Sequence, residues 1–487
     1  MMNWLTKWRS RPQTSTRNYK AVQSGSFFSF GQINSSADQA LRMALPTLRG
    51  RSRDLAINNP HISRYLDVLC TNVVGPDGFR LQTDIRNLPT KNHPEGTKDV
   101  RANQIIEAAW AEWCKYGNPT TTGKMSFVDC LNVLVKGLAR DGEVFVHLVR
   151  DPSSLHGFQL QFIEPELIDE TKNQDKPNGT KIVMGIEMSD YNKPLAYHVR
   201  ERSDDGYAGA RKTRRISADD IIHIFMPNRP SQSRGEPWTA PVMHLISMLD
   251  AYDEAHVVAA RMAANVSYAV TSSDPSVMAD EFIDDQPVTF GEPGSVLRLC
   301  AGEDVKTLAA THPTQNAASM REGIIQAVAA GLGVDYASIS QDLSKVNYSS
   351  TQFGAQGSRD YYASLHRFII SSFCQPVFER WLVMAMTVNA IELPLSKYKK
   401  FVTGSQFFPR TWHHNDPLKE MNAMSKGLES GILTIADIAK KQGRTFDEQI
   451  EELKRSKEAL EENGISFAHM PSEQKESIDE TGLRIPE

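Results

Sequence analysis

Apolar residues recur at helical spacing soon after a polar N-terminal segment. In residues 60–74 they fall on one face, Asn59-Pro60 supplies an N-cap and a first turn, and Gly75-Pro76 ends the pattern. The residues of that face are Ile62, Leu66, Leu69 and Val73. The segment therefore predicts an amphipathic helix of about four turns.

Two more helices are predicted before the pattern changes. One covers residues 98–116, and the next begins at Ser126, where Asp129 completes a capping box. After Asp141-Gly142 the apolar residues alternate in short runs, as they do in strands with one buried face. The predicted strands cover 144–149, 158–162, 182–188, 195–199 and 221–225. This half of the chain is therefore predicted to be α+β.

A polar segment at 201–215 interrupts those strands. Its glycines and its basic residues, four of them within 211–215, are typical of an exposed hairpin loop. A solvated loop explains the charges without any ligand, and it is the preferred interpretation.

Long helical patterns dominate the second half of the chain. One runs from Pro241 to about residue 266 and would be roughly 40 Å long, so it needs a packing neighbour, which residues 316–330 can supply. The stretch between them, with its Pro and Gly residues, predicts a small β insertion. Residues 331–347 are predicted to form a polar loop.

The remaining C-terminal part is also predicted to be helical. A long helix runs from Ser349 toward residue 390 and should be kinked at Pro376. Shorter helices follow Asp416, two of them opened by the capping boxes Thr434/Asp437 and Thr445/Glu448. The polar tail is expected to be disordered.

Charge and cysteine content narrow the class of protein. The 487 residues include 54 Lys and Arg against 59 Asp and Glu, a net charge of −5. A protein that holds nucleic acid over a wide surface is expected to be basic, so any contact with DNA should be weak. The five cysteines are widely spaced, which indicates neither a disulfide framework nor a zinc site. The apolar stretches are too short to span a bilayer, and residues 1–34, basic and without acids, are interpreted as a flexible arm.

Motifs that could bind phosphate are incomplete. Residues 117–124 resemble a Walker loop, but five residues separate the glycines and Met125 stands where Mg²⁺ needs a hydroxyl. Gly331 and Gly333 could begin a dinucleotide fingerprint, but Tyr336 occupies the place of the third glycine. Both segments are interpreted as turns.

Candidate catalytic and metal-binding groups also have simpler explanations. The carboxylate pairs Asp141/Glu143 and Asp219/Asp220 lie at strand edges, where turns favour Asp. His413, His414 and Asp416 stand close together, but no further metal ligand lies at a recognisable spacing from them. Asp416 is better explained as a helix cap. We therefore assign no catalytic, cofactor-binding or metal-binding residue and expect a protein that is not an enzyme.

Residues 434–455 resemble a helix-turn-helix with Gly443 in the turn. Acidic residues fill the first turns of its second helix, where a recognition helix would approach phosphates. They are Asp447, Glu448, Glu451 and Glu452. A helical packing module is preferred, and a helix-turn-helix DNA-binding regulator, which would be a small symmetric dimer, remains an alternative.

Several short stretches carry a family resemblance when they are taken in order. They are residues 48–55, 58–60 and 71–76, then 141–143, 163–165 and 234–241, then 330–334, 342–350 and 416–420. Together they resemble the lambda-type family of bacteriophage portal proteins. The matches run from about residue 48 to 455, and the combination is much more specific than any one of them.

The resemblance implies a portal fold with an α/β wing, a two-helix stem, a small β-containing clip and a helical crown. The implied parts are a basic arm (1–34), the wing (35–238), stem helices (239–266 and 316–330), the clip (267–315), a tunnel loop (331–348), a kinked helix returning to the wing (349–412), the crown (413–466) and a tail (467–487).

The implied function is a dodecameric ring at one capsid vertex of the virion, through which double-stranded DNA is packaged and ejected. It would be assembled in the host cytoplasm. Implied partners are the terminase large subunit, which would hydrolyse ATP, the major capsid and scaffold proteins, and a head-tail connector protein; no cofactor and no membrane are implied. The alternative from another class is a phage head-associated DNA-processing or maturation enzyme, which would show a nucleophile-base or carboxylate-metal site.

Two groups of residues are candidates for meeting DNA. In the tunnel loop Lys345 is the candidate phosphate contact, with Asp342 and Asn347 beside it, although Lys345 could instead pair with Asp342. On the first stem helix Asp250, Asp253 and Glu254 are candidates for the channel wall, because like charges four residues apart cost an isolated helix a few tenths of a kcal/mol. An ordinary solvated face is the alternative.

Overall fold

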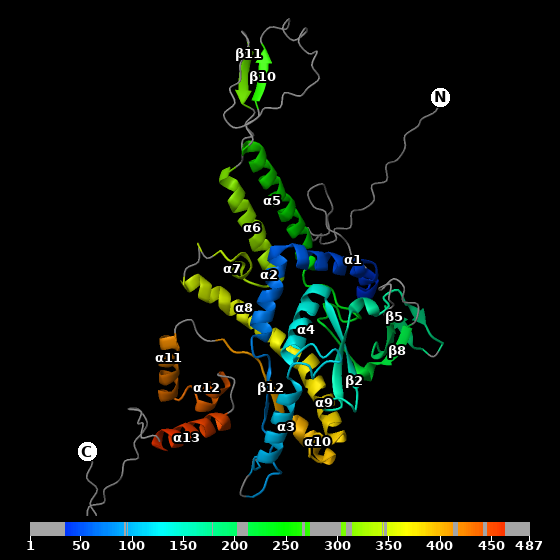
Figure 1. Ribbon diagram of the computed structural model, residues 1–487, viewed down its shortest axis with the longest axis vertical. Helices are drawn as coiled ribbons and strands as arrows, with labels where there is room; N and C mark the ends of the chain where they lie inside the picture. Colours follow the sequence, from blue (N-terminus) through cyan, green and yellow to red (C-terminus); the bar gives the residue numbers. More distant parts are fainter. Residues whose placement is uncertain are drawn as a thin grey trace, which may run out of the picture.

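The computed structural model describes residues 35–91, 94, 96–177, 179–201, 213–264, 268–272, 303–307, 314–342, 344, 348–412, 417–441 and 446–462. These residues form an α+β body, a pair of long helices that projects from it, and a separate group of short C-terminal helices (Figure 1). The predicted arm at 1–34 and tail at 467–487 lie outside the described residues.

Two helices meet at a corner at the start of the body. Helix α1 (Ala37–Asn58) precedes the predicted range and was not anticipated, whereas α2 (Pro60–Leu69) begins where its cap predicted. The Asn59 side chain accepts hydrogen bonds from the backbone N–H groups of His61 and Ile62 at 3.0 and 3.1 Å. The last turn of α2 is a π-turn (Cys70–Val74), and Gly75 ends it with φ of 71°.

The next two helices confirm the sequence prediction with small changes at their ends. Helix α3 covers Val100–Trp113 and α4 covers Phe127–Asp141. The capping box is present, since Asp129 Oδ2 accepts from the Ser126 N–H and Ser126 Oγ accepts from the Asp129 N–H. Gly142 ends α4 in the left-handed conformation, with φ of 87°.

Two antiparallel sheets follow. The first has the order β3-β2-β9 and the second the order β4-β5-β6-β7-β8. Their strands are β2 (Glu143–Arg150), β3 (Phe158–Ile163), β9 (Ile221–Phe225), β4 (Gln174–Asp175), β5 (Lys181–Val183), β6 (Ile186–Met188), β7 (Pro194–Arg200) and β8 (Thr213–Ser217).

The sheets correct two details of the sequence prediction. The strand predicted at 182–188 is a hairpin, because Met184 and Gly185 adopt positive φ values between β5 and β6. The segment predicted as a loop at 201–215 ends in strand β8, which pairs with β7. Residues 202–212 lie outside the described part of the chain.

A short sheet joins segments that are far apart in the sequence. Strand β1 (Arg80–Thr83) pairs antiparallel with β12 (Ser405–Phe408), so the end of the long C-terminal helical region returns to the body. The pairing has no local signal, and it was not predicted.

The projecting pair consists of α5 (Met243–Ala264) and α6 (Thr314–Leu332), which agree with the two predicted helices. Between them in the sequence, β10 (Tyr268–Ser272) and β11 (Glu303–Thr307) pair antiparallel, as the predicted β insertion requires. Figure 1 shows this strand pair at the far end of the helices from the body.

The predicted polar loop at 331–347 is partly helical. Helix α7 covers Tyr336–Ser340, and Ile339 on it is buried. This short helix is held in place by the burial of Ile339 and by the hydrogen bond from Ser338 Oγ to Asp335. The polar composition of the segment had predicted a loop instead.

The predicted kinked helix is present and ends near the expected residue. It consists of α8 (Tyr348–Ile369), a π-turn (Ile370–Cys374) and α9 (Gln375–Thr387). The π-turn ends two residues before Pro376, whose missing N–H cannot join the regular ladder. Beyond α9, residues up to 412 contain α10 (Tyr398–Thr403) and β12 rather than a continuing helix.

The C-terminal group consists of α11 (Pro417–Glu429), α12 (Ile435–Lys441) and α13 (Phe446–Glu462). The predicted Thr434/Asp437 capping box is formed. Thr445 of the second predicted capping box lies outside the described residues, so that box stays a prediction. His413, His414 and Asp416 also lie outside the described residues.

Aromatic residues from α3, α4 and α9 form the centre of the body. Trp110 packs edge-on against Phe127, Phe378 and Trp381, with ring centroids 4.9–5.5 Å apart. Because these rings come from residues 110 to 381, the body is one packed unit and not a string of separate domains.

Candidate functional site: the junction at the base of the projecting helices

Segments of the family-like motifs converge where the body passes into α5. Helix α1 brings residues 49–53, the end of α4 brings 141–143, and the loop before α5 brings 234–239. Ser52 Oγ and Thr239 Oγ1 lie 2.7 Å apart, so α1 is joined directly to the start of α5. The motifs therefore lie where the body meets the projecting helices, and we call this region the junction.

Glu143 is the centre of a buried ionic cluster, which we define as Arg49, Glu143, Glu170, His223 and Arg234. Its Oε1 lies 2.8 Å from Nη2 of Arg49 and 2.7 Å from Nη2 of Arg234. The side chains of Glu143 and Arg234 are 0% exposed. Glu170 contacts both arginines from the rim of the cluster.

The two arginines also satisfy backbone acceptors. Arg234 donates to the carbonyl oxygens of Met184 and Pro165 at 2.9 and 3.2 Å. Arg49 Nε donates to the carbonyl oxygen of Asp141 at 3.4 Å. One guanidinium therefore ties the loop before α5 to both sheets, and the other ties α1 to α4.

His223 and Glu143 have shifted pKa values because of their surroundings. Burial lowers the pKa of His223, and this outweighs the opposing effect of Glu143, whose Oε2 lies 2.9 Å from Nε2. For Glu143, burial alone would raise the pKa, but Arg234, His223 and Arg49 outweigh it and hold the pKa far below its usual range. A neutral His223 thus donates to an ionised Glu143.

Asp141 belongs to an outer layer of the same junction. It accepts from Arg53 Nε at 2.7 Å and from Arg140 Nη2 at 2.7 Å, while Arg53 also contacts Glu166 at 2.8 Å. The turn interpretation of Asp141-Gly142 is therefore confirmed, but Asp141 and Glu143 are not edge carboxylates facing solvent. Both are buried ion-pair partners.

Two glycines allow the loops to meet closely. A Cβ on Gly142 would lie 2.2 Å from the backbone carbon of Glu236, and one on Gly235 would lie 2.1 Å from the carbonyl oxygen of Gly142. No side chain fits at either place without moving a backbone. The Gly-Glu pattern that occurs at both 142–143 and 235–236 thus has a steric reason.

A second cluster lies at the base of the projecting helices. Asp250 Oδ1 accepts from Nδ2 of Asn59 at 2.8 Å, and Asp253 Oδ1 lies 3.0 Å from Nε of Arg321. These two candidate channel residues therefore bind to α2 and α6 of the same subunit. Glu254, the third candidate, is exposed. No described contact tests whether any of them faces a channel.

Helix α7 is held at this same base. Arg64 Nε on α2 donates to the carbonyl oxygen of Ser338 at 3.3 Å. Beyond α7, Asp342 Oδ1 accepts from the N–H and the hydroxyl of Ser344 at 2.9 and 2.6 Å. The candidate DNA contacts Lys345 and Asn347 lie outside the described residues, so the pairing of Lys345 with Asp342 is untested.

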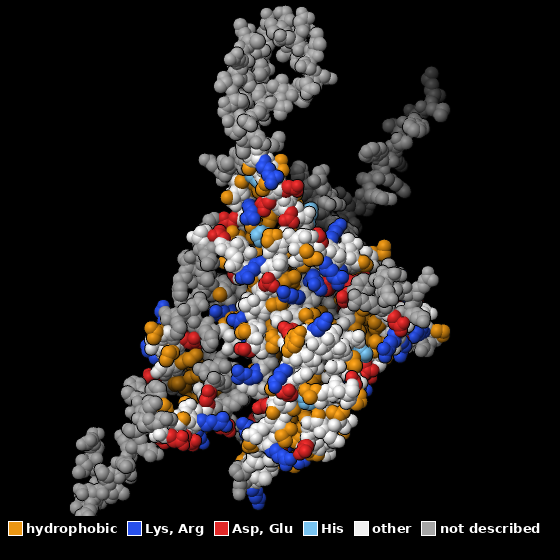
Figure 2. All heavy atoms as spheres, viewed as in Figure 1, with side chains coloured by type: hydrophobic (Ala, Val, Ile, Leu, Met, Phe, Trp, Pro, Cys, Tyr) orange, Lys and Arg blue, Asp and Glu red, His pale blue; other side chains and the backbone are white. Residues whose placement is uncertain are grey.

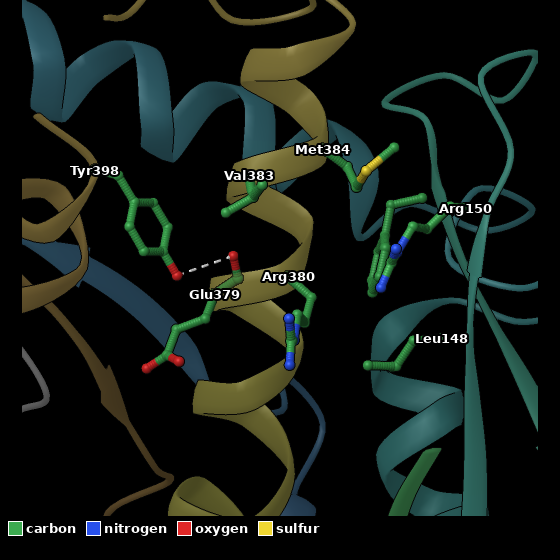
Figure 3. Close-up of a pocket in the computed structure, with 8 residues that line it drawn as sticks. Leu148, Arg150, Glu379, Arg380, Val383, Met384 and Tyr398 are labelled. Atoms are coloured by element: carbon green, nitrogen blue, oxygen red, sulfur yellow. Dashed lines mark hydrogen bonds between the residues drawn. The ribbon is translucent and has the colours of Figure 1, made fainter. Parts of the chain in front are cut away.

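Cavities in the described part show no catalytic arrangement. One of about 510 Å³ lies between β2 and α9, and Figure 3 shows Tyr398 donating from its hydroxyl to the carbonyl oxygen of Glu379 at 3.3 Å. Its charged lining residues are Arg150, Glu379 and Arg380, and Arg150 pairs with Asp220 at 2.6 Å. Among the described residues there is no cluster of three metal-binding side chains and no helix able to span a membrane.

The incomplete phosphate loop is a turn, as predicted. It connects α3 to α4, and the Gly117 N–H donates to the carbonyl oxygen of Met125 at 3.1 Å. Gly117 and Gly123 both adopt positive φ, as turn glycines do.

Comparisons with known proteins agree with these motifs. The family model described as phage portal protein, lambda family, matches residues 25–366. A probable portal protein of Halomonas phage phiHAP-1 is 30% identical over 468 residues, covering 92% of this chain and 89% of the relative. Portal protein B of Escherichia phage lambda is 25% identical over 484 residues, covering 89% of each chain.

Similarity to solved structures is weaker. A chain from the neck of a native gene transfer agent particle, computed with C12 symmetry, aligns with a TM-score of 0.41 and 10% identity. The alignment covers 79% of this chain and 91% of that one. The assignment therefore rests on the sequence matches.

The fold is of the mixed α+β class, and the family-like motifs at its junction hold α1, the end of α4 and the loop before α5 together. The matched range includes the junction and both projecting helices. This chain belongs to the lambda family of phage portal proteins.

Proposed function

We propose that this chain assembles into a closed, dodecameric ring at one capsid vertex, and that double-stranded DNA passes through the ring during packaging and ejection. The observation that carries the proposal is the match to portal proteins along 92% of the chain. The projecting helix pair supports it, because such a pair can form the wall of a central passage when several copies stand side by side (Figure 1).

In this account the parts keep the boundaries that the resemblance implies. The wing is 35–238, the stem is 239–266 and 316–330, which largely coincide with α5 and α6, and the clip is 267–315. The tunnel loop is 331–348, residues 349–412 return to the wing, and the crown is 413–466. The buried ionic cluster then joins the wing to the stem, so that force on one is passed to the other.

The surface charge suits a passage through which DNA slides. The chain carries −5 in net charge, and Figure 2 shows acidic and basic side chains interspersed on the described surface in view. A strongly basic wall would bind phosphates and slow the duplex. The candidate contact with the DNA phosphates is Lys345, with Asp342 and Asn347 beside it. A contact made by a few mobile lysines would weaken with salt and let the DNA slide. Asp250, Asp253 and Glu254 would give the stem an acidic surface.

The proposed partners follow from the place of the ring. The clip and the turns around it would dock the terminase large subunit during packaging and a head-tail connector protein afterwards. The wing would contact the major capsid and scaffold proteins. The protein would be found in the host cytoplasm during assembly and at the capsid vertex of the virion, and we assign it no cofactor.

Electron microscopy of the purified full-length chain tests the ring directly. Negatively stained particles should show closed rings with a central hole, and their mass should correspond to twelve copies of a 54.4 kDa chain. Particles that remain monomeric or dimeric at high protein concentration would contradict the proposal. A small symmetric dimer would favour the helix-turn-helix regulator.

A further inference from the structure

A groove beside strand β3 is lined by two parts of the chain that take no part in the junction. Residues 120–122, from the loop that resembled a phosphate loop, form one side, and strands β7 and β8 contribute the other. The groove has a volume of about 510 Å³, and its apolar lining includes Met125, Ile163, Val199 and Ile216. An apolar lining with a few polar groups around it is typical of a binding site.

Strand β3 lies at the edge of its sheet, and the first part of its outer edge is paired. The Leu160 N–H donates to the carbonyl oxygen of Pro119 at 2.7 Å, and its carbonyl oxygen accepts from the Thr121 N–H at 3.1 Å. The carbonyl oxygen of Phe158 accepts from Nε1 of Trp113 at 3.0 Å. Other parts of the same subunit therefore cover the outer edge as far as Leu160.

The pairing stops before Phe162, which also lines the groove. Alternate residues of a strand direct their backbone groups to the same edge, so Phe162, like Leu160, directs its N–H and carbonyl outward. A longer parallel pairing would join Phe162 to the Gly123 N–H, but that N–H donates to the carbonyl oxygen of Thr120 at 3.1 Å and turns the chain away. Within the described residues the outward N–H and carbonyl of Phe162 have no hydrogen-bond partner. Such an open edge is a template for another strand.

The charges around the groove favour a basic side chain beside the open edge. Arg200 is neutralised by its ion pair with Asp169. The other charged lining residues are Glu164, Glu201 and Arg214, all exposed, and none of the three has an ion-pair partner among the described residues. Two carboxylates thus stand against one guanidinium, and Glu164 directly follows strand β3. A basic residue close to that edge complements this arrangement.

We propose that this groove binds an extended segment of a partner protein, which adds as a strand to the open edge of β3. The backbone of the segment bonds to the N–H and the carbonyl of Phe162. An apolar side chain of the segment lies against Met125 and Ile216, and a basic side chain contacts Glu164. In strand addition the backbone hydrogen bonds provide affinity, and pockets for alternate side chains provide specificity.

The open edge also decides the conformation of the occupant. A helix keeps its own N–H and carbonyl groups bonded within itself, so it cannot supply partners for Phe162. An extended segment presents both groups along one side at the spacing of a strand. The groove and the edge belong to one subunit, so the proposal does not depend on the ring.

A phage-displayed library of random heptapeptides, presented to the purified full-length chain, is the probe for this site. The enriched sequences should place an apolar residue close to a lysine or arginine. A synthetic copy of an enriched peptide should slow hydrogen exchange at the Phe162 amide at least about tenfold, because that N–H becomes hydrogen-bonded. Hydrogen exchange read by mass spectrometry measures this change.

Charge variants show whether the peptide lies in the groove. Glu164→Lys should weaken binding of the same peptide at least about tenfold, because two like charges then face each other. Asp190→Lys is the matched control, since Asp190 is an exposed carboxylate in the turn between β6 and β7 and does not line the groove. This control should bind the peptide as the wild type does. Circular dichroism checks that both variants remain folded.

Several results would overturn the proposal. They are a library without enriched sequences, unchanged binding in Glu164→Lys, and unchanged exchange at Phe162 in the complex. Two further results would assign the groove to another occupant and also overturn it. If the Phe162 amide of the free chain exchanges slowly and deletion of residues 1–34 makes it fast, that segment of the chain is the occupant. If protection of Phe162 appears with ring formation alone, the occupant is a neighbouring copy.

Discussion

Glu143 and Arg234 face each other with both side chains fully buried, and Nη2 of Arg234 lies 2.7 Å from Oε1 of Glu143. The pair is completed by Arg49, His223 and the backbone N–H of Gly235, which donates to Glu143 Oε2 at 3.1 Å. The loop that leads into α5 is thus held to the body by a buried charge and not by apolar contact alone. Removing one partner leaves the others buried and uncompensated.

The first prediction concerns that pair. Glu143→Ala should lower the free energy of unfolding by about 3–5 kcal/mol, because two buried guanidinium groups lose their carboxylate. The measurement is chemical denaturation followed by tryptophan fluorescence. Asp67→Ala removes an exposed partner of Lys136 and serves as the control, with an expected loss below about 1 kcal/mol. If both variants lower the free energy of unfolding by the same amount, the buried ionic cluster does not stabilise the junction.

A second prediction compares two glycines. Gly142→Ala should destabilise the body by at least about 2 kcal/mol, because φ is 87° and the new Cβ would meet the Glu236 backbone. Gly50→Ala in α1 should stabilise the protein by about 0.5–1 kcal/mol, since that position is helical and open. Thermal unfolding of both variants gives the comparison, and the same sign for both would refute the steric account.

The third prediction is a pH dependence that His223 contributes. Burial lowers its pKa in the folded protein from 6.5, so the unfolded chain binds the proton first as the pH falls. Stability is therefore full above about pH 6.5 and decreases as the pH drops below it, with roughly 1.4 kcal/mol lost per pH unit at most. His223→Gln, which can still donate to Glu143, should lose less stability between pH 7 and 5 than the wild type.

Other buried histidines contribute to the same pH dependence. Burial also lowers the pKa of His156 and His366, so His223→Gln removes part of the slope and not all of it. His147→Gln, which removes the hydrogen bond to Gln161 from the central strand β2 and leaves the buried ionic cluster intact, is the matched histidine substitution. An unchanged slope in His223→Gln would show that the histidine does not titrate as inferred.

The fourth prediction concerns the tunnel loop. Lys345→Glu should assemble normally but lower the amount of DNA retained or the packaging rate, because a mobile positive charge near the duplex becomes negative. Asp342→Asn tests the alternative, in which Lys345 only stabilises the loop by pairing with Asp342. If the Lys345→Glu variant packages and retains as much DNA as the wild type, Lys345 does not contact the DNA.

Local signals in the sequence predicted much of the fold. The caps at Asn59 and Ser126, four of the five predicted strands and the two long helices follow from short-range rules, and the structure confirms them. Helix α1 was missed because Pro46 and its many polar residues obscure the buried face, which includes Arg49 and Ser52. The β1–β12 pair joins residues about 320 positions apart, and no local pattern indicates such a pairing.

The junction could not be predicted as a site for a similar reason. Arg49, Glu143 and Arg234 stand in three separate motifs, and only the tertiary structure brings their charges together. Helical spacing offers one hint, since Arg49 falls on the same face of α1 as the buried Leu41 and Leu45. A charged residue in line with apolar ones indicates a buried partner, but it does not identify that partner.

DNA packaging in capsids assembled with and without this chain tests the central claim most directly. The quantity to measure is the mass of DNA protected from nuclease per assembled head. Heads assembled with the wild-type chain should protect DNA, and heads lacking it should assemble a shell but protect little or none. Equal protection in both would contradict the account, because DNA would then enter without the portal.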